Sequence, residues 1–77
     1  MKKLLKGERV RVVQRDHPLY QQSGTVVRVR MADDGAWVEM DGDLPEAVRQ
    51  FPAGSPQARH VVMYPDQCGA VRQVVGR

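Results

Sequence analysis

The sequence predicts an all-β fold in a single domain, and three observations support this prediction. The chain has 77 residues, which is room for one small core. Its valine-rich runs are short, and most alternate apolar and polar residues with the period of two that marks a half-buried strand. Glycine and proline separate these runs at short intervals. We therefore expect one small five-stranded barrel over residues 1–77.

The first strand is expected at Gly7–Gln14, where valines alternate with arginines. The polar stretch Arg15–Ser23 that follows contains Pro18 and ends before a glycine, so we expect a long loop there. Leu19 and Tyr20 are the residues of this loop that are available to anchor it.

The second strand is expected at Gly24–Met31. Regular alternation places Val27, Val29 and Met31 on one face of this strand. Val26 then shares the opposite face with two arginines. This strand therefore carries apolar side chains on both faces.

The dipeptide Asp34-Gly35 predicts a hairpin turn into a third strand, Gly35–Asp41. In that strand three aliphatic residues alternate with Trp37 and two acids. We expect the aliphatic residues inside the fold and Trp37 on the outer face.

The longest irregular stretch is Asp41–Gln57, which holds three prolines and two glycines. Asp43 is expected to cap a short helical or 3₁₀ turn over Pro45–Gln50, in which the proline stands early, where its missing N–H does no harm. Phe51 is expected to pack this insertion against the barrel.

The fourth and fifth strands are expected at Ala58–Tyr64 and Ala70–Val75. Pro65 and Asp66 predict a tight turn of 3₁₀ type between them. The sequence shows no internal repeat and no low-complexity segment.

The composition argues against several classes of protein. No apolar run approaches the roughly 18 residues that a membrane span requires, and the N-terminal residues lack the apolar middle region of a signal peptide. The single cysteine cannot form an internal disulfide, which agrees with a reducing compartment. We expect a soluble cytoplasmic protein without a membrane association.

Charge is divided unevenly along the chain. Residues 1–30 carry a net charge of +6, residues 31–47 carry −6 and residues 48–77 carry +3, so the total of +3 conceals a strong segregation. In a closed barrel such segments can neutralise one another, and the basic total alone does not establish a nucleic-acid surface.

The order of these elements resembles the Src-homology-3-like small barrel: five short strands, a long first loop, a central hairpin and a 3₁₀ turn before the last strand. The first two strands also resemble the KOW-type barrels of transcription and ribosomal proteins, whose Gly-x-x-Val-x-Val … Gly-x-Val-x-x-Val pattern is matched around Gly7 and Gly24. The loop between these glycines is longer here and carries Asp16 and Pro18 in place of a compact Lys-Gly stretch. KOW membership would imply RNA or polymerase binding.

A second resemblance is to the plasmid-type trimethoprim-resistant dihydrofolate reductase, a tetrameric barrel with a Val-Gln-Ile-Tyr-Pro strand motif. The run Val61–Pro65 is similar to that motif, and Tyr64 carries over. The family's glutamine falls on Val62, and its first-strand lysine falls on Val12, so the polar groups that orient substrate are replaced. An oligomeric reductase-like barrel is the alternative that this resemblance implies.

No coherent catalytic set is present in the sequence. Cys68 has no adjacent group that would stabilise a thiolate. His17 and His60 are far apart and lack the spacing of metal ligands. The acids of residues 33–46 lack the fixed ligand spacing of a calcium loop. We interpret them as solvated turn residues, with a contact surface for a basic partner as the alternative. We therefore expect a non-enzymatic protein without a cofactor or bound metal.

Arginines on the first two strands suggest an alternative function in nucleic-acid binding. Those strands are neighbours in this barrel, so the arginines would form a basic ladder near Tyr20. The members of this ladder are Arg9, Arg11, Arg28 and Arg30. The simpler interpretation of the same residues is charge that keeps the surface soluble.

We expect a small binding or adaptor module whose partner is most simply a protein. In Src-homology-3-like barrels, aromatic residues near the first loop and the 3₁₀ turn dock extended peptides. The candidates here are Tyr20, Trp37, Phe51 and Tyr64. Apolar residues on both strand faces also suggest self-association, for example as a dimer, and the residues concerned are Val13, Val26, Val61 and Val75.

Overall fold

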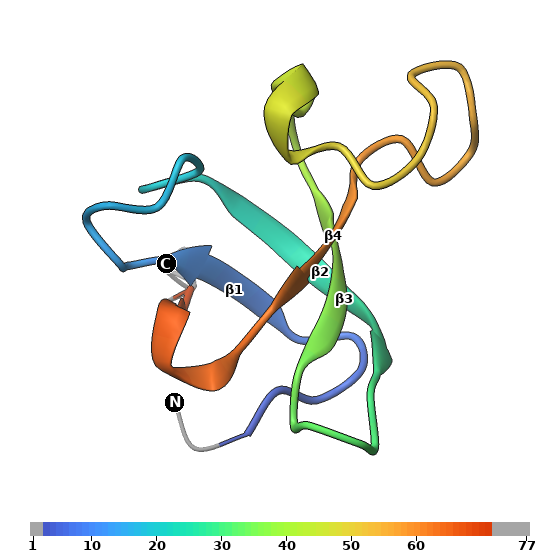
Figure 1. Cartoon of the computed structure of the whole chain (residues 1–77). Coiled ribbons are helices and arrows are strands. Elements are labelled where there is room, and N and C mark those ends of the chain that lie inside the picture. The colour runs from blue at the N-terminus through green and yellow to red at the C-terminus, as the bar shows by residue number, and fades with distance from the viewer. Residues whose placement is uncertain (1–2, 72–77) are drawn as a thin grey trace, which may run out of the picture.

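The computed structural model describes residues 3–71, which form one five-stranded antiparallel sheet and two single-turn 3₁₀ helices (Figure 1). The strands are β1 (Arg9–Val12), β2 (Ser23–Val29), β3 (Ala36–Met40), β4 (His60–Met63) and β5 (Cys68–Ala70). The 3₁₀ helices are η1 (Glu46–Val48) and η2 (Pro65–Gln67). The predicted all-β class is confirmed.

The strands lie in the order β4-β3-β2-β1-β5, so β1 pairs with both the second and the last strand. The sheet is strongly twisted, and the insertion that holds η1 projects from one end of it (Figure 1). η2 lies at the other end, where it links β4 to β5. Within the described residues, no helix is long and apolar enough to cross a membrane.

Twelve side chains form the hydrophobic core, and the strands supply most of them at every second position. In β3 the three aliphatic residues are buried while Trp37 and Glu39 are half-buried on the outer face, as predicted. Three leucines outside the strands, Leu4, Leu19 and Leu44, complete the core. The core consists of Leu4, Val10, Val12, Leu19, Val26, Ala36, Val38, Met40, Leu44, Val61, Met63 and Cys68.

A β-bulge in β2 overturns the predicted faces of that strand. Val26 pairs with Val38 of β3, but the next pair along β3 joins Arg28 to Trp37, which leaves Val27 as the extra residue. Val26, before the bulge, is 1% exposed and belongs to the core, while beyond the bulge Arg28 is exposed and Val29 packs against the core. Met31, assigned to the same face as Val27, lies beyond the strand and is 93% exposed.

The bulge and the packing of β4 also remove part of the case for self-association. Val26 and Val61 are both core residues, so they offer no surface to a second copy. Val13 is exposed, and Val75 lies outside the described residues. Self-association remains a prediction, but two of the four valines on which it rested are buried.

The long first loop is anchored by one of its two expected anchors. Leu19 is fully buried, whereas Tyr20 is exposed. At the start of the following strand, a Cβ on Gly24 would lie 2.6 Å from the carbonyl oxygen of Glu39 and 2.7 Å from the side chain of Val38. Glycine is therefore required there by the close approach of β3.

The β2–β3 hairpin is confirmed, although its loop is longer than a two-residue turn and runs through residues 30–35. Asp34 takes the left-handed conformation with φ of 62°. The backbone N–H of Gly35 donates to the Asp33 carboxylate at 3.1 Å, which closes the turn locally. Asp33 is thus held by the hairpin itself.

The insertion forms its short turn without the expected cap. Pro45 occupies the N-cap position of η1 and provides no side-chain hydrogen bond, so the predicted capping by Asp43 is wrong. Leu44 anchors the insertion by entering the core. Phe51 packs against Trp37 with ring centroids 5.5 Å apart, which confirms its predicted role.

The last strand is displaced from its predicted place. β5 covers Cys68–Ala70 and follows η2 directly, whereas the expected strand began at Ala70. Residues 72–75 of that expected strand lie outside the described part of the chain.

Candidate functional site

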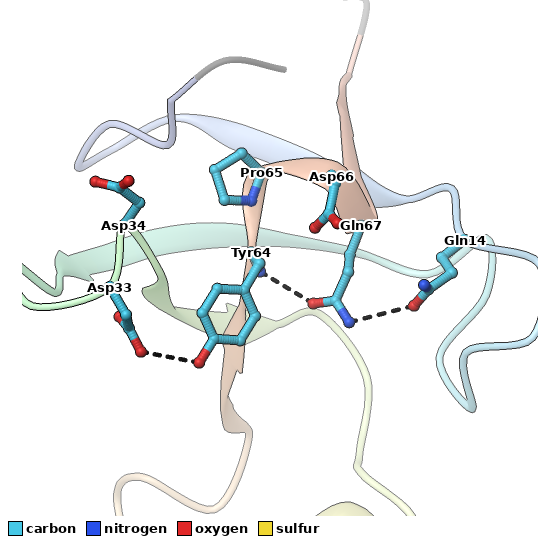
Figure 2. Close-up of a pocket in the computed structure, with 7 residues that line it drawn as sticks. All are labelled: Gln14, Asp33, Asp34, Tyr64, Pro65, Asp66 and Gln67. Carbon is cyan, nitrogen blue, oxygen red and sulfur yellow. Dashed lines mark hydrogen bonds between the residues drawn. The ribbon is translucent and has the colours of Figure 1, made fainter.

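A polar groove opens where the β2–β3 loop meets η2 (Figure 2). It has a volume of about 540 Å³. The lining residues come from the end of the first strand region, the hairpin loop and η2, and they are Gln14, Asp33, Asp34, Tyr64, Pro65, Asp66 and Gln67. We call this hollow the Tyr64 groove.

Hydrogen bonds around η2 fix one wall of the Tyr64 groove. The backbone N–H of Tyr64 donates to the Gln67 side-chain carbonyl at 3.0 Å, and the backbone N–H of Gln67 donates to the Tyr64 carbonyl at 2.9 Å. The Gln67 amide also donates to the side-chain oxygen of Gln14 at 3.2 Å. Since Pro65 fixes its own φ, this wall is held in one conformation.

The tyrosine ring reaches across the groove to the hairpin loop. Its hydroxyl donates to the second oxygen of Asp33 at 2.9 Å (Figure 2). The ring passes so close to Gly35 that a Cβ there would lie 2.9 Å from it. Tyr64 therefore joins the end of β4 to the loop before β3.

This contact changes the acidity of both partners. The pKa of the Asp33 carboxyl is lowered, first because the Gly35 N–H donates to it, then because the Tyr64 hydroxyl does, with Arg30 adding a favourable charge. The pKa of the Tyr64 phenol is raised because its hydrogen bond to Asp33 favours the protonated form. At neutral pH the groove thus holds a carboxylate and a neutral phenol.

The Tyr64 groove is acidic. Three carboxylates, those of Asp33, Asp34 and Asp66, line it. Arg30 forms an ion pair with Asp33 at 3.2 Å, and it is the only basic side chain among the described residues that pairs with a lining acid. The groove therefore suits a cationic ligand group.

The four predicted aromatic contact residues do not gather at one place. Trp37 and Phe51 pack together, and Phe51 also meets His60 edge-on at 6.5 Å. Tyr64 lies in its own groove. Tyr20 is exposed on the first loop and does not line the Tyr64 groove.

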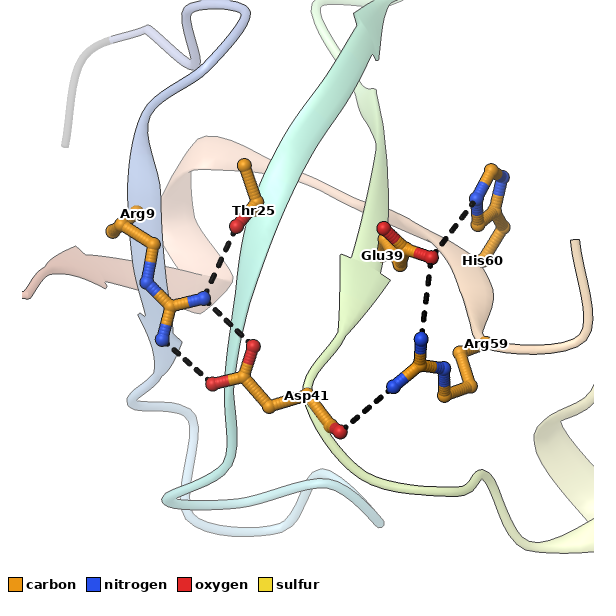
Figure 3. Close-up of polar contacts among 6 residues, drawn as sticks. All are labelled: Arg9, Thr25, Glu39, Asp41, Arg59 and His60. Carbon is orange, nitrogen blue, oxygen red and sulfur yellow. Dashed lines mark hydrogen bonds and ion pairs between the residues drawn. The ribbon is translucent and has the colours of Figure 1, made fainter.

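Arginines and acids form a network across the outer face of the sheet (Figure 3). Arg9 makes two hydrogen bonds to the Asp41 carboxylate, at 2.7 and 2.6 Å, and a third to the Thr25 hydroxyl. Arg59 donates to the Asp41 backbone carbonyl at 2.9 Å and approaches Glu39 at 3.5 Å. These contacts lower the pKa of the Asp41 carboxyl, chiefly through Arg9, and raise that of Arg9.

The expected arginine ladder is therefore divided. Arg9 and Arg30 each have a carboxylate partner. Arg11 and Arg28 form no ion pair with another residue that the structure describes. Arg28 stands directly across from Trp37 in the β2–β3 register.

Burial makes the sole cysteine unsuited to nucleophilic chemistry. Cys68 is 2% exposed, and burial raises the pKa of its thiol to about 11. The thiol is therefore protonated at neutral pH. His17 has a local role, since its Nδ1 accepts the backbone N–H of Leu19 at 3.0 Å.

The sequence identified Tyr64 but not most of its neighbours in the groove. Gln14, Asp66 and Gln67 were not candidate contact residues, although the Pro-Asp-Gln turn beside the tyrosine was itself a signal. Aspartates in the hairpin loop were interpreted chiefly as turn residues. The alternative interpretation, a contact surface for a basic partner, had no location in the sequence; the structure places Asp33 and Asp34 beside η2 in the Tyr64 groove (Figure 2).

Searches among protein families, curated proteins and solved structures find no match to this chain. Its function must therefore be inferred from the geometry of its surfaces.

Proposed function

We propose that the protein is a non-enzymatic binding module that docks an extended, cationic segment of a partner protein in the Tyr64 groove. The observation that supports this proposal is the groove itself, in which a tyrosine and a proline lie among three aspartates. The hydrogen bonds around Tyr64 and Gln67 hold it ready for a ligand, which lowers the entropic cost of binding.

The chemistry of the lining defines the segment. Pro65 and the ring of Tyr64 offer apolar surface to an extended backbone, while the two glutamine side chains carry amide groups that can meet backbone polar groups. Asp34 and Asp66 form no ion pair with a described residue, so their charge is available to lysine or arginine. A proline-containing segment with basic residues fits these features.

The topology is consistent with a Src-homology-3-like barrel. β1 pairs with both β2 and β5, the first loop is long, and a 3₁₀ turn links the last two strands. In such barrels the comparable face binds extended peptides. This resemblance adds to the case made by the groove.

The alternatives suggested by the sequence receive less support. A reductase-like pore would need polar groups where Val12 is 2% exposed in the core and where Val62 presents only an aliphatic side chain. A continuous ladder of arginines for nucleic-acid binding would need the charges of Arg9 and Arg30. These two side chains instead form ion pairs with Asp41 and Asp33.

Titration with fluorescent peptides tests the proposal. A peptide with alternating proline and arginine should bind with an affinity that falls with salt, and Asp34→Asn should weaken it about two- to fivefold, the effect of one exposed ion pair. The matched control is Asp43→Asn, which removes an exposed carboxylate outside the groove. Absence of binding, or equal losses in the two variants, would refute the proposed site.

A further inference from the structure

A second hollow lies on the outer face of the sheet, beside the aromatic residues of β3 and the insertion. It has a volume of about 340 Å³, within the range of small-ligand pockets, which begins at about 300 Å³. Its lining combines apolar, aromatic and polar side chains: Val27, Arg28, Trp37, Phe51, Gln57 and His60. We call it the aromatic hollow.

Two rings shape the aromatic hollow. The planes of Trp37 and Phe51 are inclined at 51° with their centroids 5.5 Å apart, so together they form a corner. Both side chains are half-buried, and each presents part of its ring to the hollow. A flat ring can stack on one face of this corner and rest its edge against the other.

Arg28 supplies a cation beside these rings. The outer-face guanidinium groups of Arg9 and Arg59 are engaged by acids (Figure 3), but Arg28 pairs with no carboxylate among the described residues. The bulge at Val27 sets the register in which Arg28 faces Trp37. The hollow thus joins an aromatic surface to a positive charge that no carboxylate of residues 3–71 pairs with.

Gln57 and His60 complete the polar part of the lining. A glutamine amide both donates and accepts hydrogen bonds, and so does a neutral imidazole. Side chains of this kind can pair with the edge of a heteroaromatic ring that is stacked on an aromatic residue. The His60 side chain is 22% exposed, and its Nε2 lies 4.0 Å from the Glu39 carboxylate, too far for a hydrogen bond, so the imidazole can still pair with a ligand (Figure 3).

We propose that the aromatic hollow binds a nucleobase together with its phosphate, either as a free nucleotide or within a single strand. The base stacks in the corner formed by Trp37 and Phe51, while Arg28 meets the phosphate. An acidic peptide could satisfy the charge of Arg28, but it would not use the flat corner and the amide at once. This site is separate from the Tyr64 groove, and neither proposal depends on the other.

The only tryptophan of the chain provides the measurement. Adenosine monophosphate and an oligothymidylate are each titrated at low salt while the fluorescence of Trp37 is recorded. Stacking on the indole should quench it. Arg28→Gln should weaken the binding of either probe about tenfold, since it removes a charge-assisted contact.

Arg11→Gln is the matched control, because Arg11 is an exposed arginine of the neighbouring strand that does not line the hollow. It should change affinity less than twofold. Quenching by the mononucleotide identifies a free nucleotide as sufficient, and quenching by the oligonucleotide alone identifies a single strand. Circular dichroism confirms that each variant is folded.

Three results would overturn the proposal: no quenching by either probe, equal weakening by Arg28→Gln and Arg11→Gln, or quenching by an acidic peptide in the absence of a response to both nucleotides. The last result would assign the hollow to a protein partner.

Discussion

Asp33 takes part in three local contacts, and its charge is favoured by all of them. The Gly35 N–H and the Tyr64 hydroxyl donate to its carboxylate, and Arg30 lies 3.2 Å away. Its pKa in the folded protein is consequently below the ordinary value of 3.8. Stabilisation from this group is fully present above the ordinary value and is lost as the pH falls through the folded one.

We therefore expect the free energy of unfolding to decrease between about pH 5 and about pH 2.5, and part of that decrease to belong to Asp33. Asp33→Asn keeps an oxygen acceptor but removes the charge, so it should reduce the dependence on pH. Tyr64→Phe removes one of the two donors and should give an intermediate dependence. Urea unfolding at the two pH values measures this, and identical profiles for all three proteins would contradict the argument.

Secondary-structure elements were predictable where a local pattern determined them. Alternation in β3 correctly placed Trp37 outside, and Asp34-Gly35 correctly marked the hairpin. The faces of β2 could not be predicted, because a run of valines does not reveal which one is the extra residue of a bulge. The contact of Tyr64 with Asp33 was equally inaccessible, since these residues are distant in the sequence and meet only when the hairpin lies beside η2.

The bulge in β2 leads to a prediction that distinguishes the observed faces of the strand from those expected for strict alternation. Val26→Ala should lower the free energy of unfolding by about 2 kcal/mol, because it removes two buried methyl groups and leaves a cavity. Val27→Ala, at the extra residue on the outer side, should cost less than about 1 kcal/mol. Chemical denaturation of the two variants measures the difference. A larger loss of unfolding free energy for Val27→Ala would contradict the bulge and support strict alternation in β2.

Across the whole molecule, the sheet brings together the oppositely charged segments of the chain. Arg9 belongs to the basic first segment, and Arg59 belongs to the basic third segment. Both are bound to residues of the acidic middle segment, namely Asp41 and Glu39 (Figure 3). The segregation seen in the sequence is thus largely cancelled on this face, which is why the net charge alone is a poor guide to a nucleic-acid surface.

The neutralisation of Arg9 by Asp41 can be removed by a single substitution. Asp41→Asn removes the carboxylate charge and one of the two oxygen acceptors that hold Arg9, so the guanidinium should become more available to polyanions. Asp43→Asn raises the net charge by the same amount, yet Asp43 pairs with no described arginine. We expect the Asp41→Asn variant to elute from a heparin column at higher salt than the Asp43→Asn variant, because it frees a specific cation as well as changing the total charge. Elution of both variants at the same salt concentration would mean that total charge, and not the pairing of Arg9, governs the binding of polyanions.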